Sequence, residues 1–133
     1  MKVTGTILIV DGSPVMRRVV ERSLRMAGLE SGRVLEAADG QEALNLAGQN
    51  SPDLILTELN LAELDGLELL RQLRQTPATE AIPVVIITSE AGEKHVLDAL
   101  ALGASGYIRK PFTSEQVKDY IGPLFGLTPA AAR

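Results

Sequence analysis

The feature that most constrains the fold is a regular alternation of short apolar runs with helical patterns along the 133 residues of the chain. The apolar runs are Ile7–Val10, Val34–Leu35, Leu54–Leu56, Val84–Ile87 and Tyr107–Ile108. Several are apolar at consecutive positions, which is typical of parallel strands that are covered on both faces. Five strands alternating with five helices predict an α/β fold: a doubly wound, five-stranded parallel sheet with helices on both faces.

The segments between these runs carry residues that begin and end helices. Ser13 precedes Pro14, an N-cap residue followed by proline in the first turn, so a helix is predicted to begin there. Three further starts are predicted from pairs spaced for a capping box: Asp39 with Glu42, Asp65 with Glu68, and Thr113 with Gln116. Because Gly122 and Pro123 follow Ile121, the last helix is predicted to end or kink near Ile121.

The composition excludes several classes of function. A net charge of −4 provides no basic patch for nucleic acid, and the cations at Arg17 and Arg18 are too few to change that. Without cysteine the chain has no disulfide or thiolate metal site. No apolar run approaches the roughly 18–20 residues that cross a bilayer, and the N-terminus lacks the pattern of a secretory signal. We therefore expect a cytoplasmic protein that binds neither nucleic acid nor membrane.

Four residues with chemically useful side chains stand at the predicted carboxyl ends of successive strands: Asp11, Glu58, Thr88 and Lys110. In an open α/β sheet, ligands bind at this edge, near the switch in strand order. Each residue alone has a simple structural explanation, such as a turn acid or a solvated cation. Their coincidence at one edge predicts a site for a phosphoryl group or a cation.

The segments around these strand ends resemble those of response-regulator receiver domains, in order, and within that family the CheY-like type. The matching segments are Ile7–Asp11, Leu54–Asn60, Leu64–Gly66, Ile86–Ser89 and Gly103–Phe112. The resemblance covers about residues 6–125 and implies the flavodoxin/CheY-like strand order 2-1-3-4-5. We expect residues 1–125 to form one receiver domain and residues 126–133 to be a tail or the start of a linker.

The resemblance also implies roles for single residues. In the family, two adjacent acids after the first strand help to hold Mg²⁺, and an aspartate after the third strand accepts the phosphoryl group. The corresponding metal ligands here are Asp11, Glu58 and the backbone carbonyl of Asn60, while Thr88 and Lys110 correspond to contacts of the phosphate oxygens. The chain departs from this pattern twice: Gly12 replaces the second acid, and Glu58 replaces the acceptor aspartate.

These two departures predict weakened phosphoryl chemistry. Mg²⁺ requires near-octahedral oxygen ligands, and Glu58 carries its carboxylate about 1.5 Å farther from the backbone than aspartate does. Phosphoryl transfer depends on accurate positioning of the nucleophile and the metal. We therefore expect weak or lost magnesium binding and no enzymatic activity. Glu58 either imitates the phosphorylated state in part or pairs with Lys110 in an inert site, and the sequence leaves both open.

The leading hypothesis is a two-component signalling receiver that works without phosphorylation, through protein–protein interaction. The alternative is a functional phosphoacceptor that is phosphorylated at the Glu58 position with Mg²⁺. By resemblance, Thr88 and Tyr107 correspond to the switch that alters one face of a receiver. That face is built from the fourth helix (around Val96–Leu102), the fifth strand (Tyr107–Ile108) and the fifth helix (from Thr113 to about Ile121). A protein partner is expected there, with a histidine kinase as a further candidate. His95, the only histidine, is predicted to be a surface residue. A flavodoxin-like cofactor site is disfavoured, because the loop after Asp11 is not rich in hydroxyl groups.

Overall fold

The predicted alternation of strands and helices is confirmed in a computed structural model, which describes residues 5–29, 32–89 and 93–125. The strands are β1 (Thr6–Val10), β2 (Arg33–Ala37), β3 (Leu54–Thr57), β4 (Val84–Thr88) and β5 (Gly106–Arg109). The helices are α1 (Pro14–Met26), α2 (Gly40–Asn50), α3 (Gly66–Gln75), α4 (Glu93–Ala101) and α5 (Ser114–Ile121), followed by a short 3₁₀ helix (Gly122–Phe125). The tail predicted for residues 126–133 lies outside the described residues.

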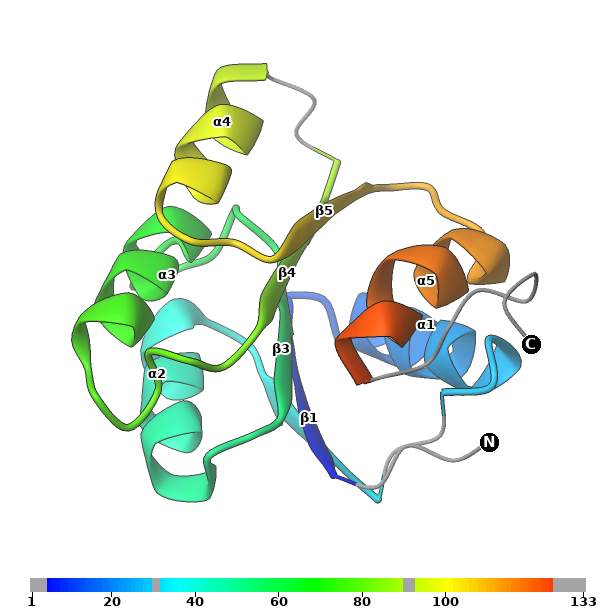
Figure 1. The fold of residues 1–133 in the computed structure, drawn as a ribbon, viewed down its shortest axis with the longest axis horizontal. Coiled ribbons are helices and arrows are strands. Elements are labelled where there is room, and N and C mark those ends of the chain that lie inside the picture. The colour runs from blue at the N-terminus through cyan, green and yellow to red at the C-terminus, as the bar shows by residue number, and fades with distance from the viewer. Residues whose placement is uncertain (1–4, 30–31, 90–92, 126–133) are drawn as a thin grey trace.

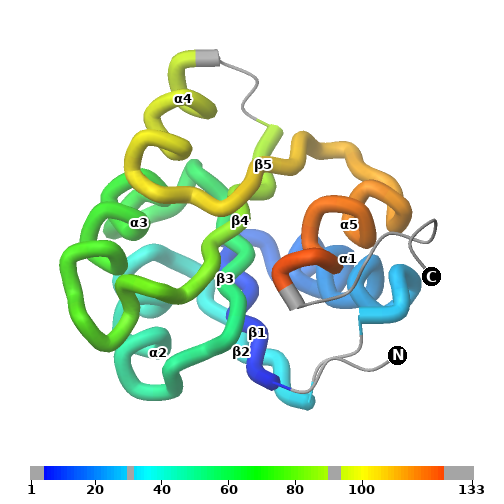
Figure 2. The backbone as a smooth tube through the Cα atoms, in the orientation of Figure 1, coloured from blue at the N-terminus to red at the C-terminus, as the bar shows by residue number. Residues whose placement is uncertain are grey.

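All five strands are parallel and form one sheet in the order β2-β1-β3-β4-β5, as predicted. Figure 1 shows α2, α3 and α4 on one face of the sheet and α1 and α5 on the other. The tube view makes the same three layers visible, with β2 at the edge beside β1 (Figure 2). Strand β2 lies on one side of β1, whereas β3, β4 and β5 follow on the other side. The carboxyl ends of β1 and β3 therefore border the crevice where such folds bind ligands.

The sheet separates two apolar clusters, one on each face. Leu8 and Val10 of β1 join the cluster under α2, α3 and α4, while Ile7 and Ile9 join the cluster under α1 and α5. Because successive strand residues point to opposite faces, a strand covered on both faces must be apolar at every position. This packing explains the consecutive apolar residues of the sequence. No helix among the described residues is long and apolar enough to cross a membrane.

The helix ends follow the predicted signals. The Ser13 hydroxyl accepts a hydrogen bond from the Met16 amide at 3.1 Å. The carboxylates of Asp39 and Asp65 cap α2 and α3 in the same way. Only the pair of Thr113 and Gln116 forms a fully reciprocal capping box among the described helices. Helix α5 ends at Ile121 and continues as the 3₁₀ helix, because proline at the next turn removes a backbone donor.

At the amino-terminal edge of the sheet, the Arg74 guanidinium joins α3 to the chain before β4 and to the turn after α4. It donates to the carbonyl oxygens of Ile82 at 2.7 Å, Gly103 at 2.8 Å and Glu80 at 3.1 Å. Gly103 has a φ of 97°, and a Cβ there would lie 2.9 Å from Arg74 Nε. Burial lowers the pKa of Arg74 below its usual value. The backbone supplies the partners of this partly buried cation.

Candidate functional site

The structure brings together the four predicted strand-end residues at the carboxyl edge of the sheet. Lys110 Nζ lies 2.8 Å from Asp11 Oδ2 and 2.7 Å from Glu58 Oε2. The Thr88 hydroxyl donates a hydrogen bond to Glu58 Oε1. Asp11, Glu58 and Thr88 are all buried, with exposed fractions of 8%, 7% and 0%. The four side chains therefore form one hydrogen-bonded group with Glu58 at its centre.

The Glu58 carboxylate turns back over its own loop. Besides the Thr88 hydroxyl, its Oε1 atom accepts the backbone amides of Leu59 at 3.0 Å and Asn60 at 3.3 Å. Its Oε2 atom accepts the ammonium of Lys110. The extra methylene of glutamate makes this possible, since the longer side chain can reach both the following amides and the ends of β4 and β5. Both oxygens of the buried carboxylate are thus satisfied, as burial of a charge requires.

The backbone that carries Glu58 is fixed from two sides. The Glu58 amide donates to the Val10 carbonyl at 3.0 Å, which continues the pairing of β1 and β3. On the other side, Gly66 at the start of α3 donates to the Leu59 carbonyl at 2.8 Å. A Cβ at Gly66 would lie only 2.5 Å from the Glu58 carbonyl oxygen, so a glycine is needed for this close approach. The site loop is clamped between the sheet and α3.

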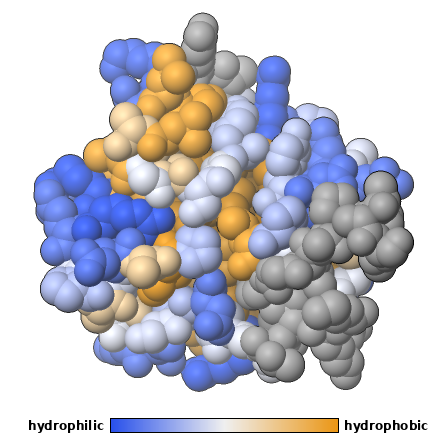
Figure 3. Space-filling view, viewed as in Figure 1, coloured by the Kyte–Doolittle hydropathy of each residue, from blue (hydrophilic) through white to orange (hydrophobic). Residues whose placement is uncertain are grey.

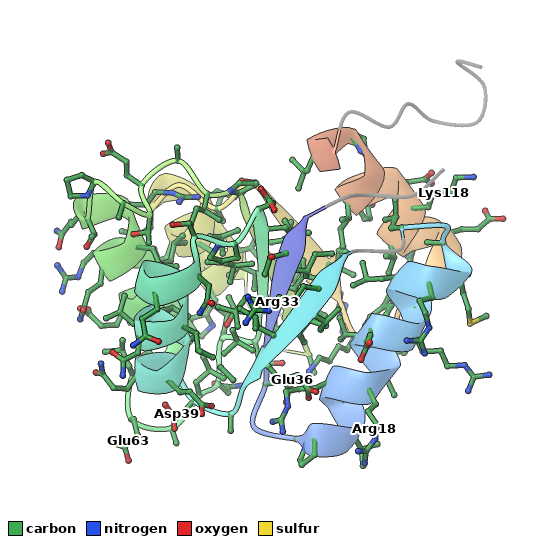
Figure 4. All side chains as sticks on the ribbon, turned by 90° about the horizontal axis from the view of Figure 1, so that it is seen from below. Arg18, Arg33, Glu36, Asp39, Glu63 and Lys118 are labelled. Atoms are coloured by element: carbon green, nitrogen blue, oxygen red, sulfur yellow. The ribbon has the colours of Figure 1, made fainter. Side chains whose placement is uncertain are left out.

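Asp11 is held by a second set of contacts that the sequence reasoning missed. Its Oδ1 atom accepts a hydrogen bond from the Ser13 amide at 2.9 Å, and its backbone carbonyl accepts one from Arg17 Nη1 at 2.7 Å. Arg17 Nε in turn pairs with Glu36 Oε1 at 2.7 Å. Figure 4 shows Glu36 on β2 on the side toward α1. Arg17 therefore supports the site loop instead of being a free surface cation; only its place one turn after Ser13 could have indicated this.

The charges around Lys110 act in opposite directions. Burial lowers the pKa of the Lys110 ammonium, but hydrogen bonds to Asp11 and Glu58, together with the attraction of both carboxylates, outweigh burial and raise that pKa above its usual value. The side chain is only 15% exposed, so water screens this attraction little. Lys110 therefore remains a cation in the folded protein at neutral pH.

The residues present do not fit a resident magnesium ion in this arrangement. Each carboxylate oxygen of Asp11 and Glu58 already accepts a hydrogen bond. No group of three or more acids or histidines that could hold a metal occurs within residues 5–29, 32–89 and 93–125. Gly12 adds no ligand, although a Cβ there would have its nearest neighbour, the Ala38 carbonyl oxygen, at 3.7 Å. A side chain at residue 12 would fit, but a third carboxylate is missing.

The two switch positions predicted by resemblance, Thr88 and Tyr107, lie close together on one face of the sheet. Ile86 pairs with Tyr107 in the register of β4 and β5, and Thr88 lies two residues beyond Ile86. Residues two apart on a strand share a face, so Thr88 and Tyr107 are diagonal neighbours on the side of α4. Tyr107 is half-buried and packs against the apolar cluster on that side. The Thr88 hydroxyl that binds Glu58 and the Tyr107 ring therefore lie on the same face of the sheet, on neighbouring strands.

The surface over α4, β5 and α5 carries exposed apolar side chains. Leu97 and Leu100 of α4 are 57% and 47% exposed, and Tyr120 of α5 is 55% exposed. Figure 3 shows a hydrophobic area over α4 at the upper left. Between β5 and α5 lies an open depression of about 420 Å³, lined by Tyr107, Arg109, Gln116 and Tyr120 among others. His95, at the start of α4, is exposed as predicted.

Comparisons with known proteins agree with this geometry. The response regulator receiver domain family model matches residues 7–122. A "Chemotaxis protein CheY homolog" from Campylobacter jejuni is 36% identical over 121 residues, covering 90% of this chain and 92% of that protein. Chemotaxis protein CheY4 of Vibrio cholerae superposes with a TM-score of 0.79 at 30% identity, covering 91% of this chain and 98% of that one.

A further solved structure is similar and contains a metal. The receiver domain of the sensor histidine kinase PA1611 from Pseudomonas aeruginosa has a magnesium ion coordinated in its active-site cleft. It superposes with a TM-score of 0.81 at 29% identity, covering 92% of this chain and 98% of that one. The chain belongs to the response regulator receiver domain family, with the CheY-like fold of five parallel strands and five helices.

Proposed function

We propose that this receiver domain signals without phosphorylation and acts by binding another protein, with Glu58 standing where a phosphoryl group would act. One observation carries the proposal: the Glu58 carboxylate contacts the Thr88 hydroxyl and the Lys110 ammonium simultaneously. By resemblance, these two groups contact phosphate oxygens in the family. A carboxylate that engages both supports an arrangement resembling the phosphorylated state more than an empty acceptor site.

The imitation is partial. A phosphoryl group carries about −1.5 to −2 charges and three acceptor oxygens, whereas a carboxylate carries −1 and two. The magnesium ligands implied by resemblance, Asp11, Glu58 and the Asn60 carbonyl, form a weakened set because Gly12 contributes nothing. The proposed module is therefore a two-component signalling receiver with a fixed state, and no enzyme activity is assigned to it.

The proposed partner surface is the face of α4, β5 and α5. Receiver domains interact with kinases and with target proteins. The exposed Leu97 and Leu100, together with the depression beside Tyr107, would provide apolar contact for a protein partner. A histidine kinase remains a second candidate partner. We propose further that residues 1–125 form the receiver domain, that residues 126–133 are a tail or linker, and that the protein acts in the cytoplasm.

The competing function is magnesium-dependent phosphorylation at Glu58, and one experiment separates the two. The protein is incubated with acetyl phosphate and MgCl₂ and then analysed by intact mass spectrometry. We expect no phosphoryl adduct on the wild-type chain. The matched control is the double variant Gly12→Asp with Glu58→Asp, which restores both family residues where space allows and should acquire an adduct. A stoichiometric adduct on wild-type Glu58 would overturn the proposal.

A second experiment separates a signalling glutamate from an inert ion pair. The Glu58→Ala variant removes the contacts to Thr88 and Lys110, so the amide resonances of β5 and α4 should shift in NMR spectra. They should move away from the pattern that beryllofluoride and Mg²⁺ induce in the Gly12→Asp, Glu58→Asp control. If the β5 and α4 resonances stay unchanged in Glu58→Ala, the carboxylate only fills an inert site.

A further inference from the structure

We infer that the Lys110 ammonium is the resident cation of this site and takes the place of the divalent metal, so that removing it would reopen a magnesium site. The inference goes beyond the proposed function, because a site without metal could either signal or stay silent. It concerns which cation neutralises Asp11 and Glu58, and it follows from the contacts of these three residues.

The first argument is the position of the ammonium. Lys110 Nζ bridges the two carboxylates, at 2.8 Å from Asp11 Oδ2 and 2.7 Å from Glu58 Oε2. The other oxygens of the two acids, Asp11 Oδ1 and Glu58 Oε1, accept backbone amides, so a divalent ion shared by these acids would bind the same oxygens as Lys110. The ammonium and the metal therefore compete for these ligands.

The second argument is charge. Two carboxylates and one ammonium leave a single negative charge, and a divalent ion added to them would make the group net positive. A third carboxylate at residue 12 would bring the group loaded with both cations to neutrality, but the chain has Gly12 there. In a partly buried site, where screening is weak, this difference in charge weighs heavily against holding both cations. Because Lys110 is part of the chain and already lies between the two acids, the loss of the second acid leaves no negative charge to offset a divalent ion beside it.

The third argument is that Glu58 cannot readily turn toward a metal. Its Oε1 atom is held by the amides of Leu59 and Asn60 and by Thr88, so the carboxylate is oriented by three donors. Its Oε2 atom is linked to Asp11 by the Lys110 ammonium, which donates to both carboxylates. If the ammonium is removed, Oε2 and Asp11 Oδ2 lose their shared donor and become two adjacent, unpaired oxygens. Hard cations such as Mg²⁺ prefer oxygen ligands of this kind.

The test is a titration with MgCl₂, followed through the amide resonances of residues 11–13 and 59–60 in NMR spectra. We expect the resonances of the wild-type protein to show no saturable shift. Those of Lys110→Met should shift and saturate, with a magnesium affinity at least about tenfold higher than that of the wild type. Lys110→Arg keeps the positive charge and should behave like wild type. The matched control is Lys118→Met on α5, which Figure 4 shows away from the carboxyl-edge residues Asp39 and Glu63.

Two results would overturn the inference. Magnesium binding by the wild type as tight as that of Lys110→Met would show that the ammonium does not exclude the metal. A folded Lys110→Met variant that binds no magnesium would show that Gly12 alone closes the site. Circular dichroism establishes folding for each variant, and Lys110→Gln provides a second neutral substitution if Lys110→Met is unfolded. Phosphorylation is not measured, so the outcome is independent of the proposed function.

Discussion

Two partly buried cations lie at opposite edges of the sheet, and their partners differ in kind. At the carboxyl edge, Lys110 faces the carboxylates of Asp11 and Glu58. At the amino edge, the partners of Arg74 within the described part of the chain are carbonyl oxygens of the backbone. The carboxylates raise the pKa of Lys110 despite its burial, whereas burial lowers the pKa of Arg74. One cation is balanced by formal charges and the other by dipoles.

The difference separates an edge that could exchange its cation from one that could not. Side chains that hold a cation through formal charges can exchange it for another charged group, such as a metal ion. A cation held by backbone carbonyls has no such competitor, because those oxygens stay where the chain before β4 and the turn after α4 place them. We therefore expect substitutions at Lys110 to respond to charge and pH, and substitutions at Arg74 to change stability alone.

The largest effect on stability is expected from Lys110→Met. The two buried carboxylates would lose their common partner, which should lower the free energy of unfolding by about 3 kcal/mol at neutral pH, as measured by urea denaturation. Adding Glu58→Gln to Lys110→Met should recover part of this loss, since one unpaired charge disappears. A double variant less stable than Lys110→Met would contradict the view that the carboxylates, and not lost packing, cause the effect.

A smaller loss is expected from Arg74→Ala. The three carbonyl oxygens would lose a charged donor, and we expect the free energy of unfolding to fall by about 2 kcal/mol. Because no carboxylate is involved, the loss should be the same with and without MgCl₂, which distinguishes it from Lys110→Met, and it should also stay constant across pH 6–9. Arg22→Ala, an exposed arginine of α1, is the matched control and should leave stability unchanged.

The smallest effect is expected from pH. The folded pKa of Lys110 is raised above the unfolded value of about 10.4, so its contribution to stability is complete below that pH and is lost as the pH rises through the folded pKa. The difference in unfolding free energy between wild type and Lys110→Met should therefore stay constant at pH 8–9 and shrink in more alkaline solution. A difference that grows with alkaline pH would contradict the raised pKa.

The sequence predicted the interior of the fold better than its edges. The run Ile7–Val10 matches β1 to within one residue, because β1 is covered on both faces and every position after Thr6 is apolar and buried. The predicted run Val34–Leu35 is shorter than β2, which extends over Arg33–Ala37. Arg33 and Glu36 are exposed on this edge strand, and an apolar pattern cannot report strand residues that face water.

The composition of the site was predictable, but its arrangement was not. Strand ends placed Asp11, Glu58, Thr88 and Lys110 at one edge, and the structure brings them together. Whether Glu58 would turn toward Thr88 or pair only with Lys110 depends on side-chain torsions that no sequence pattern specifies, and the structure shows both contacts at once. Arg74 was missed because its contact with Gly103 joins residues 29 positions apart. The roles of the four site residues in signalling stay predictions.

Because Arg74 lies so close to Gly103, the order in which these two residues are substituted matters. A side chain at Gly103 would meet both an unfavourable φ of 97° and the guanidinium of Arg74. If Arg74 is replaced first by a small residue, only the backbone conformation opposes a later change at Gly103. In the other order, both obstacles act together. The tolerance of residue 103 therefore depends on what residue 74 already is, and the two positions are epistatic although neither touches the site.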